Sequence, residues 1–149
     1  MGTITKDFSY REFEKTDVPG MQVQNTIATV AVRDSVKALV ENVLQPLRDA
    51  WGKPIAINSG YRCPELNAKV GGVPTSQHAK GEAADVCPFG RNGHGDVETV
   101  RKLAAMVMEL GLPFDQMMLY NSFVHISHRL KGGQRGQVLY AKTYKGGKI

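Results

Sequence analysis

The stretch Ser76-Gln-His-Ala-Lys-Gly-Glu-Ala-Ala-Asp85 brings an imidazole and, seven residues later, a carboxylate into one short segment. Both side chains are good ligands for zinc. Gly81 and the alanines that follow it leave room for the backbone to turn and for an ion to approach. Asp85 lies among apolar neighbours, and a buried carboxylate is costly unless a cation or hydrogen-bond donors accompany it. The stretch therefore predicts a metal site built on His78 and Asp85.

A third protein ligand must come from elsewhere, because catalytic zinc sites use three protein ligands and keep one position open. The remaining histidines are His94, His125 and His128. His94 lies in an Asn-Gly-His-Gly sequence that is typical of a solvent-exposed loop. Side chains of an extended segment alternate between two faces, so His125 and His128 should not reach the same ion. The spacing leaves the choice between these two open.

The apolar pattern around this stretch predicts a mixture of helices and strands. Helical spacing runs from 31 to 51, with a kink or break at Pro46 and an end at Gly52. Further helices are expected after a capping box at Ser9–Glu12, over 65–70 and from Asp96 to 110. Strands are expected over 54–60, 82–86, 116–120, 123–127 and 138–143. The closely spaced late strands favour an α+β fold with a mainly antiparallel sheet and flanking helices.

The size and composition fit one domain over residues 1–149, with 42% apolar and 22% charged residues. This apolar fraction excludes a disordered chain. No stretch approaches the roughly 18 apolar residues of a membrane-spanning helix, so we expect no membrane insertion. Cys63 and Cys87 are too few for a disulfide scaffold and form no CxxC pair, so we expect reduced, packing cysteines.

The net charge of +5 comes from the glycine-rich end of the chain. From Arg129 onward there are six basic and no acidic residues, whereas the rest has 13 basic and 14 acidic residues. Such an end is either a solvated segment or one attracted to an anionic polymer. We expect no nucleic-acid binding, because no recognition helix or aromatic-basic motif is present. Met1–Lys6 contains no apolar signal-peptide segment.

Five positions of the opening stretch match the SxHxxGxAxD signature of the M15 zinc peptidases, the D-alanyl-D-alanine carboxypeptidase and dipeptidase group. They are Ser76, His78, Gly81, Ala83 and Asp85. Asn58-Ser-Gly-Tyr-Arg-Cys-Pro64 and Phe123-Val-His-Ile-Ser127 resemble the flanking motifs of the phage-endolysin-like and carboxypeptidase-like members, in the same order. Val43-Leu-Gln-Pro-Leu47 is also similar, so the resemblance covers most of the chain. It implies a hedgehog/D,D-peptidase-like fold.

The resemblance also implies roles for individual residues. His78, Asp85 and His125 are expected to bind one zinc ion, which resolves the choice that the spacing left open. Arg62 matches an arginine that contacts the substrate or the developing oxyanion, and its planar charged fork suits both. Ser76 and Gln77 line the same loop and are expected to hold substrate or His78.

The general base of the family is an acidic residue three positions before the last zinc-binding histidine, and here that position is Ser122. Serine cannot accept a proton at neutral pH. Asp115 is the nearest acidic candidate, and it could equally cap a turn or brace a ligand histidine. Glu82 and His128 should face away from the site by strand alternation.

We therefore expect a monomeric zinc metallopeptidase that cuts peptidoglycan by metal-activated water. The bond would lie in the stem peptide or crosslink, as for a D,D-carboxypeptidase, a D,D-endopeptidase or an L-alanyl-D-glutamate endopeptidase. The expected setting is synthesis in the cytoplasm and action on the wall after release, as a phage lysin or a virion-associated enzyme. The alternative is a zinc-stabilised domain with weakened catalysis that binds cell wall or protein, which Ser122 would permit.

Overall fold

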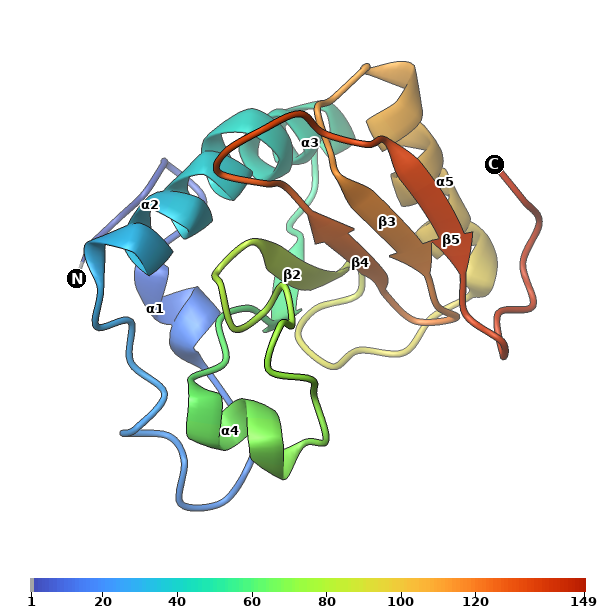
Figure 1. The fold of residues 1–149 in the computed structure, drawn as a ribbon. Coiled ribbons are helices and arrows are strands. Elements are labelled where there is room, and N and C mark those ends of the chain that lie inside the picture. The colour runs from blue at the N-terminus through green and yellow to red at the C-terminus, as the bar shows by residue number, and fades with distance from the viewer. Residues whose placement is uncertain (1) are drawn as a thin grey trace.

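A computed structural model describes residues 2–149 and shows one mixed sheet; the longer helices lie together, and the short helix α4 (Pro64–Lys69) lies apart from them (Figure 1). The strands lie in the order β1-β2-β4-β3-β5. Their bounds are β1 Ala56–Ser59, β2 Ala83–Cys87, β3 Gln116–Leu119, β4 Val124–Ser127 and β5 Gln137–Tyr140. Neighbouring strands from β1 to β3 pair antiparallel, and only the β3–β5 pair is parallel. The predicted α+β class with a mainly antiparallel sheet is confirmed.

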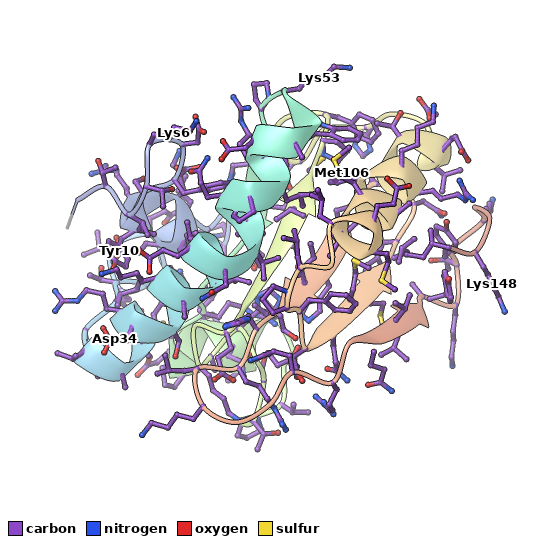
Figure 2. All side chains as sticks on the ribbon, turned by 90° about the horizontal axis from the view of Figure 1, so that it is seen from above. Lys6, Tyr10, Asp34, Lys53, Met106 and Lys148 are labelled. Atoms are coloured by element: carbon purple, nitrogen blue, oxygen red, sulfur yellow. The ribbon has the colours of Figure 1, made fainter. Side chains whose placement is uncertain are left out.

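Strand alternation makes one face of the sheet entirely apolar. The strand residues that point to this side are fully or almost fully buried: Ile57, Ala84, Val86, Met117, Leu119, Val124 and Ile126. Helices α2 (Val30–Leu39), α3 (Gln45–Trp51) and α5 (Val97–Glu109) cover them. The α2–α3 segment and α5 lie side by side when seen from above, with Met106 between them (Figure 2). The opposite face carries the polar strand residues, so the sheet separates the core from the site.

The predicted long helix begins at Val30 and is divided into three parts. These are α2 Val30–Leu39, a π-helical turn η1 Val40–Leu44, and α3 Gln45–Trp51. Pro46 lacks an N–H and lies in the first turn of α3, directly after the π-helical turn, so it cannot donate to the preceding turn of the helix. The break expected at Pro46 therefore occurs as a widened turn just before it. Gly52 ends α3 in the left-handed conformation, as predicted.

The remaining helices begin close to the residues at which the sequence predicts them. They are α1 Tyr10–Glu14, α4 Pro64–Lys69 and α5 Val97–Glu109. The Glu12 carboxylate accepts from the Ser9 N–H at 2.9 Å, and Asp96 caps α5 through the Thr99 N–H at 2.8 Å. None of the helices between residues 2 and 149 has the length and apolar character needed to cross a bilayer. Cys63 and Cys87 are buried and free, as expected.

The basic end of the chain is more ordered than a solvated segment would be. Asp115, with a side chain only 1% exposed, binds Arg135 at 2.8 Å and Arg129 at 3.6 Å. Gly136 N–H and Gln137 N–H also donate to backbone carbonyls at the start of β3. Two of the six cationic residues thus neutralise an interior carboxylate, which leaves fewer charges available for an anionic polymer.

Candidate metal centre

The register of β2 against β4 brings the second and third expected ligands together. Asp85 and His125 are directly opposite each other in this antiparallel pair. Directly paired residues project to the same side of a sheet, and their side chains are in contact. Because Ala84 and Val86 point into the core, Asp85 must face the open side. The register alone therefore joins a carboxylate and an imidazole that are 40 residues apart.

His78 reaches the same point from the turn before β2. Its Nδ1 lies 2.7 Å from the Gly60 carbonyl oxygen, and its Nε2 lies 3.3 Å from Asp85 Oδ1. The backbone is held as well, because the Arg62 and Gly81 N–H groups both donate to the His78 carbonyl. When a metal is bound, a hydrogen bond from Nδ1–H to the Gly60 carbonyl would keep the ring proton off Nε2, the nitrogen that faces Asp85.

The three side chains have the composition and spacing of a metal site. His125 Nδ1 lies 3.0 Å from Asp85 Oδ1, and one ligand atom from each of the three residues lies within 4.8 Å of the others. Burial alone would raise the pKa of Asp85, but hydrogen bonds from His125 and His78 outweigh it and hold that pKa well below its usual range. A deprotonated carboxylate and two imidazoles match the donors that zinc takes in catalytic sites.

The turn between His78 and Asp85 requires glycine at position 81. Its φ is +74°, and an added Cβ would lie 2.9 Å from both Val32 Cγ1 and the Val32 carbonyl oxygen. The turn therefore packs directly on helix α2, with no room for a side chain.

We expect Gly81→Ala to lower the free energy of unfolding by about 2 kcal/mol, from backbone strain together with overpacking. Gly71→Ala is the matched control, because Gly71 has φ +78° but an added Cβ there would meet nothing within 4 Å. The control should cost only about 1 kcal/mol. Denaturant unfolding of both variants measures the difference, and equal losses would contradict the packing argument.

Arg62 and Ser76 lie beside the triad. Arg62 Nη2 donates to Ser76 Oγ at 3.3 Å, and the same oxygen accepts from the His78 N–H at 3.2 Å. Arg62 lines a cleft of about 180 Å³ together with Asn58 and Ser59. Its buried Nε has no hydrogen-bond partner among residues 2–149. Burial lowers the pKa of Arg62 and the negative charge of Asp85 opposes this, so the guanidinium is within electrostatic reach of the triad.

Gln77 contacts a ligand histidine rather than an open surface. Its Oε1 lies 2.8 Å from His125 Nε2, and its Nε2 donates to Gln116 Oε1 at 2.8 Å. The expected role in substrate binding remains a prediction. The contact that the structure does show is with His125.

The other candidate general bases, Asp115, Glu82 and His128, all make contacts with groups other than the metal ligands. Asp115 binds Arg135 and Arg129, and the hydrogen bond from Arg135 holds the pKa of that carboxyl below its usual range. The Glu82 carboxylate accepts from the Leu130 N–H at 3.1 Å. His128 Nδ1 lies 2.6 Å from the Pro113 carbonyl, in keeping with the predicted alternation. The contacts of Asp115 are those of a structural ion pair, so its assignment as base remains a prediction.

Three features of the site were missed from the sequence. They are the Gly60 carbonyl, the Gln116 amide and the Tyr120 ring. Burial raises the pKa of Tyr120, and the negative charge of Asp85 raises it further, so this phenol lies near the triad. Residues 116, 118 and 120 share one face of an extended segment, and Met118 pairs directly with His125. This alternation was the signal that places Gln116 and Tyr120 on the same face as the site.

Comparison with known proteins matches most of the chain to one family. Residues 8–127 match the family model described as Peptidase M15. A segment of 44 residues is 48% identical to the zinc D-Ala-D-Ala carboxypeptidase of Streptomyces albus G. That segment is 29% of this chain and 17% of the relative, so most of the relative's length has no counterpart in the match. The triad and Arg62 all lie inside the residues that the family model covers.

Proposed function

The chain belongs to the peptidase M15 family, and from this we propose that it is a zinc-dependent peptidase that hydrolyses an amide bond in the stem peptide or crosslink of peptidoglycan. The observation that carries the proposal is the His78–Asp85–His125 cluster on the open face of the sheet. The name of the Streptomyces relative supports both the metal and a D-Ala-D-Ala substrate. Three protein ligands hold one zinc ion and leave room for water and substrate.

The surrounding residues supply substrate binding. Bound zinc would polarise the peptide carbonyl and lower the pKa of the attacking water. Arg62, which has a buried and unpartnered Nε–H and contacts Ser76 beside His78, is suited to a substrate carboxylate or to the developing oxyanion. Ser76 fixes the guanidinium relative to His78, because its hydroxyl contacts both. An anionic, extended peptide is the substrate class that this arrangement favours.

Defined muropeptides test the proposal directly. We expect the purified chain to cleave one class of stem peptide, to lose this activity with a zinc chelator, and to regain it when zinc is restored. Mass spectrometry of the products identifies the bond and separates D,D-cleavage from L-alanyl-D-glutamate cleavage. Failure to cleave any muropeptide in the zinc-loaded state would rule out the enzymatic proposal.

Ser122 favours a second candidate, a zinc-stabilised domain that binds wall peptide or protein and has lost most of its catalysis. Ser122 stands where the family resemblance implies an acidic base, and its carbonyl accepts from the buried Cys87 thiol at 3.3 Å. Peptide binding without cleavage would support this candidate.

We expect Ser122→Asp to raise the cleavage rate by about 100-fold, because a positioned general base contributes on the order of 10²–10⁴. Ser122→Asn is the matched control: it has the same shape but accepts no proton, and should leave the rate near that of the wild type. Initial rates on a single muropeptide at saturating zinc measure both. An unchanged rate in the aspartate variant would mean that the native site already has a proton acceptor.

The proposal also includes where the protein acts and what it acts on. We propose that the peptidase acts on the wall after release, as a phage lysin or as part of a virion. We propose that it acts as a monomer with peptidoglycan as its partner.

A further inference from the structure

A row of three glutamine side chains joins the third ligand to the outer edge of the sheet. His125 Nε2 lies 2.8 Å from Gln77 Oε1, Gln77 Nε2 donates to Gln116 Oε1 at 2.8 Å, and Gln116 Nε2 donates to Gln137 Oε1 at 2.7 Å. Gln116 and Gln137 are directly paired across β3 and β5, which explains their contact. The row therefore begins at the metal centre and ends at an exposed residue of the edge strand.

Each glutamine amide in this row could direct its NH₂ group either toward His125 or away from it. The position of the ring proton of His125 determines which orientation applies. His125 Nδ1 faces Asp85 Oδ1 at 3.0 Å, whereas Nε2 faces Gln77, so Nδ1 is the nitrogen that would bind the metal. A nitrogen that binds a metal carries no proton, so the ring proton of neutral His125 must be on Nε2. Gln77 then has to present its oxygen to that N–H. The rest of the row follows, because each amide that accepts on oxygen has its NH₂ free to donate onward.

The two ligand histidines are thus oriented in different ways. The partner of His78 is the Gly60 carbonyl, a backbone group that no side-chain substitution removes. The partner of His125 is a side chain whose own amide is fixed by Gln116. Both arrangements place an acceptor on the nitrogen that does not bind metal. Only the arrangement at His125 depends on the identity of particular side chains.

We propose that Gln77 is a positioning residue that holds His125 in the tautomer and ring orientation needed for metal binding, with Gln116 and Gln137 fixing its amide. The inference rests on the metal centre of the proposed function. Gln77 acts on the ligand and not on the substrate. As a neutral acceptor, it orients the imidazole without adding charge to the ligand set.

The test measures zinc affinity and the protonation of the ring nitrogens in the full chain. Gln77→Leu removes the acceptor, Gln77→Glu keeps an acceptor but cannot donate to Gln116, and Gln116→Leu breaks the next contact. Gln24→Leu is the matched control, because Gln24 is exposed and lies outside the row. Competition with a chromophoric chelator gives the dissociation constant for zinc. Nitrogen-15 NMR of the imidazoles shows which nitrogen carries the proton.

For Gln77→Leu we expect the dissociation constant for zinc to rise by about 10- to 100-fold, the usual effect of losing the partner of a ligand histidine. The slowly exchanging Nε2–H signal of His125 should disappear, whereas the Nδ1–H signal of His78 should persist in the same spectrum. Gln77→Glu should keep the Nε2–H signal and bind zinc far better than Gln77→Leu. Gln116→Leu should weaken zinc binding less than Gln77→Leu, and Gln24→Leu not at all.

The outcomes separate this inference from the function on which it rests. Wild-type affinity and unchanged His125 signals in Gln77→Leu would overturn the positioning role, as would equal weakening in the leucine and glutamate variants. A wild-type chain that binds no zinc would overturn the metal centre itself. If Gln77→Leu does not fold, Gln116→Leu carries the test with Gln77 in place, and unaltered affinity and spectra there would count against the row.

Discussion

Replacing His78 with alanine should abolish zinc binding at stoichiometric metal and lower peptide cleavage by at least about 1000-fold, equivalent to about 4 kcal/mol of transition-state stabilisation. The change leaves Asp85 and His125 as two ligands, fewer than the three that catalytic zinc sites use. It also removes one of the two imidazoles that contact Asp85 Oδ1, the one at 3.3 Å. Metal content after dialysis and cleavage of a defined muropeptide measure the two losses.

His94→Ala is the matched control for this prediction. His94 is exposed and lies outside the cluster, so both metal content and cleavage should remain at the wild-type level. His78 itself is buried, so the fold of its variant must be checked by circular dichroism. A folded His78→Ala variant that retains one equivalent of tightly held zinc would show that the metal is bound elsewhere.

The site could be predicted in part because its chemistry is local in sequence. His78 and Asp85 lie in one ten-residue stretch, and the cost of burying Asp85 already demanded a partner. Strand alternation correctly separated His125 from His128, which contacts the Pro113 carbonyl instead. These steps required only the residue types and the alternation of side chains between the two faces of a strand.

What could not be predicted depends on pairing between distant segments. The choice of His125 required the register of β2 against β4, which places it opposite Asp85. The contact of Gln77 with His125 joins a turn to a strand 48 residues later. The role of the Gly60 carbonyl is invisible to any pattern of side chains. Without the family resemblance, the sequence supported only two of the three ligands.

The fold shows the same division between local and distant information. Helix ends followed local signals such as the Asp96 cap and the left-handed Gly52. The parallel pairing of β5 with β3 was not predicted, because nothing in the glycine-rich segment before β5 indicates its path. That path is fixed by Arg129 and Arg135, which return to a carboxylate at the start of β3.

Arg135→Ala should therefore lower the free energy of unfolding at neutral pH, and by more than the loss of an exposed ion pair does. Asp115 accepts from the backbone N–H, Nε and Nη2 of Arg135, and its side chain is almost completely buried. Loss of the guanidinium leaves a charged carboxylate in the interior with Arg129 as its remaining cationic partner, at 3.6 Å. An uncompensated interior carboxylate is destabilising, and solvent screens part of this loss because Arg135 is about half exposed.

The loss should depend on pH with a definite sign. The hydrogen bond from Arg135 lowers the pKa of Asp115 in the folded state below its ordinary value of about 3.9. The pair therefore contributes its full stability above that ordinary pKa and loses it as the pH falls through the folded pKa. Denaturant unfolding of the wild type and of Arg135→Ala should show a difference that is largest near pH 7 and shrinks below about pH 4.

Arg101→Ala is the matched control, since Arg101 forms an exposed pair with Glu98 and its loss should cost no more than about 1 kcal/mol. Asp115→Asn separates the structural role of Asp115 from its assignment as general base. With a structural role, the folded variant is less stable but cleaves peptide at a rate within about tenfold of the wild type. The loss of a base would instead lower cleavage by about 10²- to 10⁴-fold at a temperature where the protein is fully folded. That result would assign the catalytic proton transfer to Asp115, in spite of its ion pairs with Arg135 and Arg129.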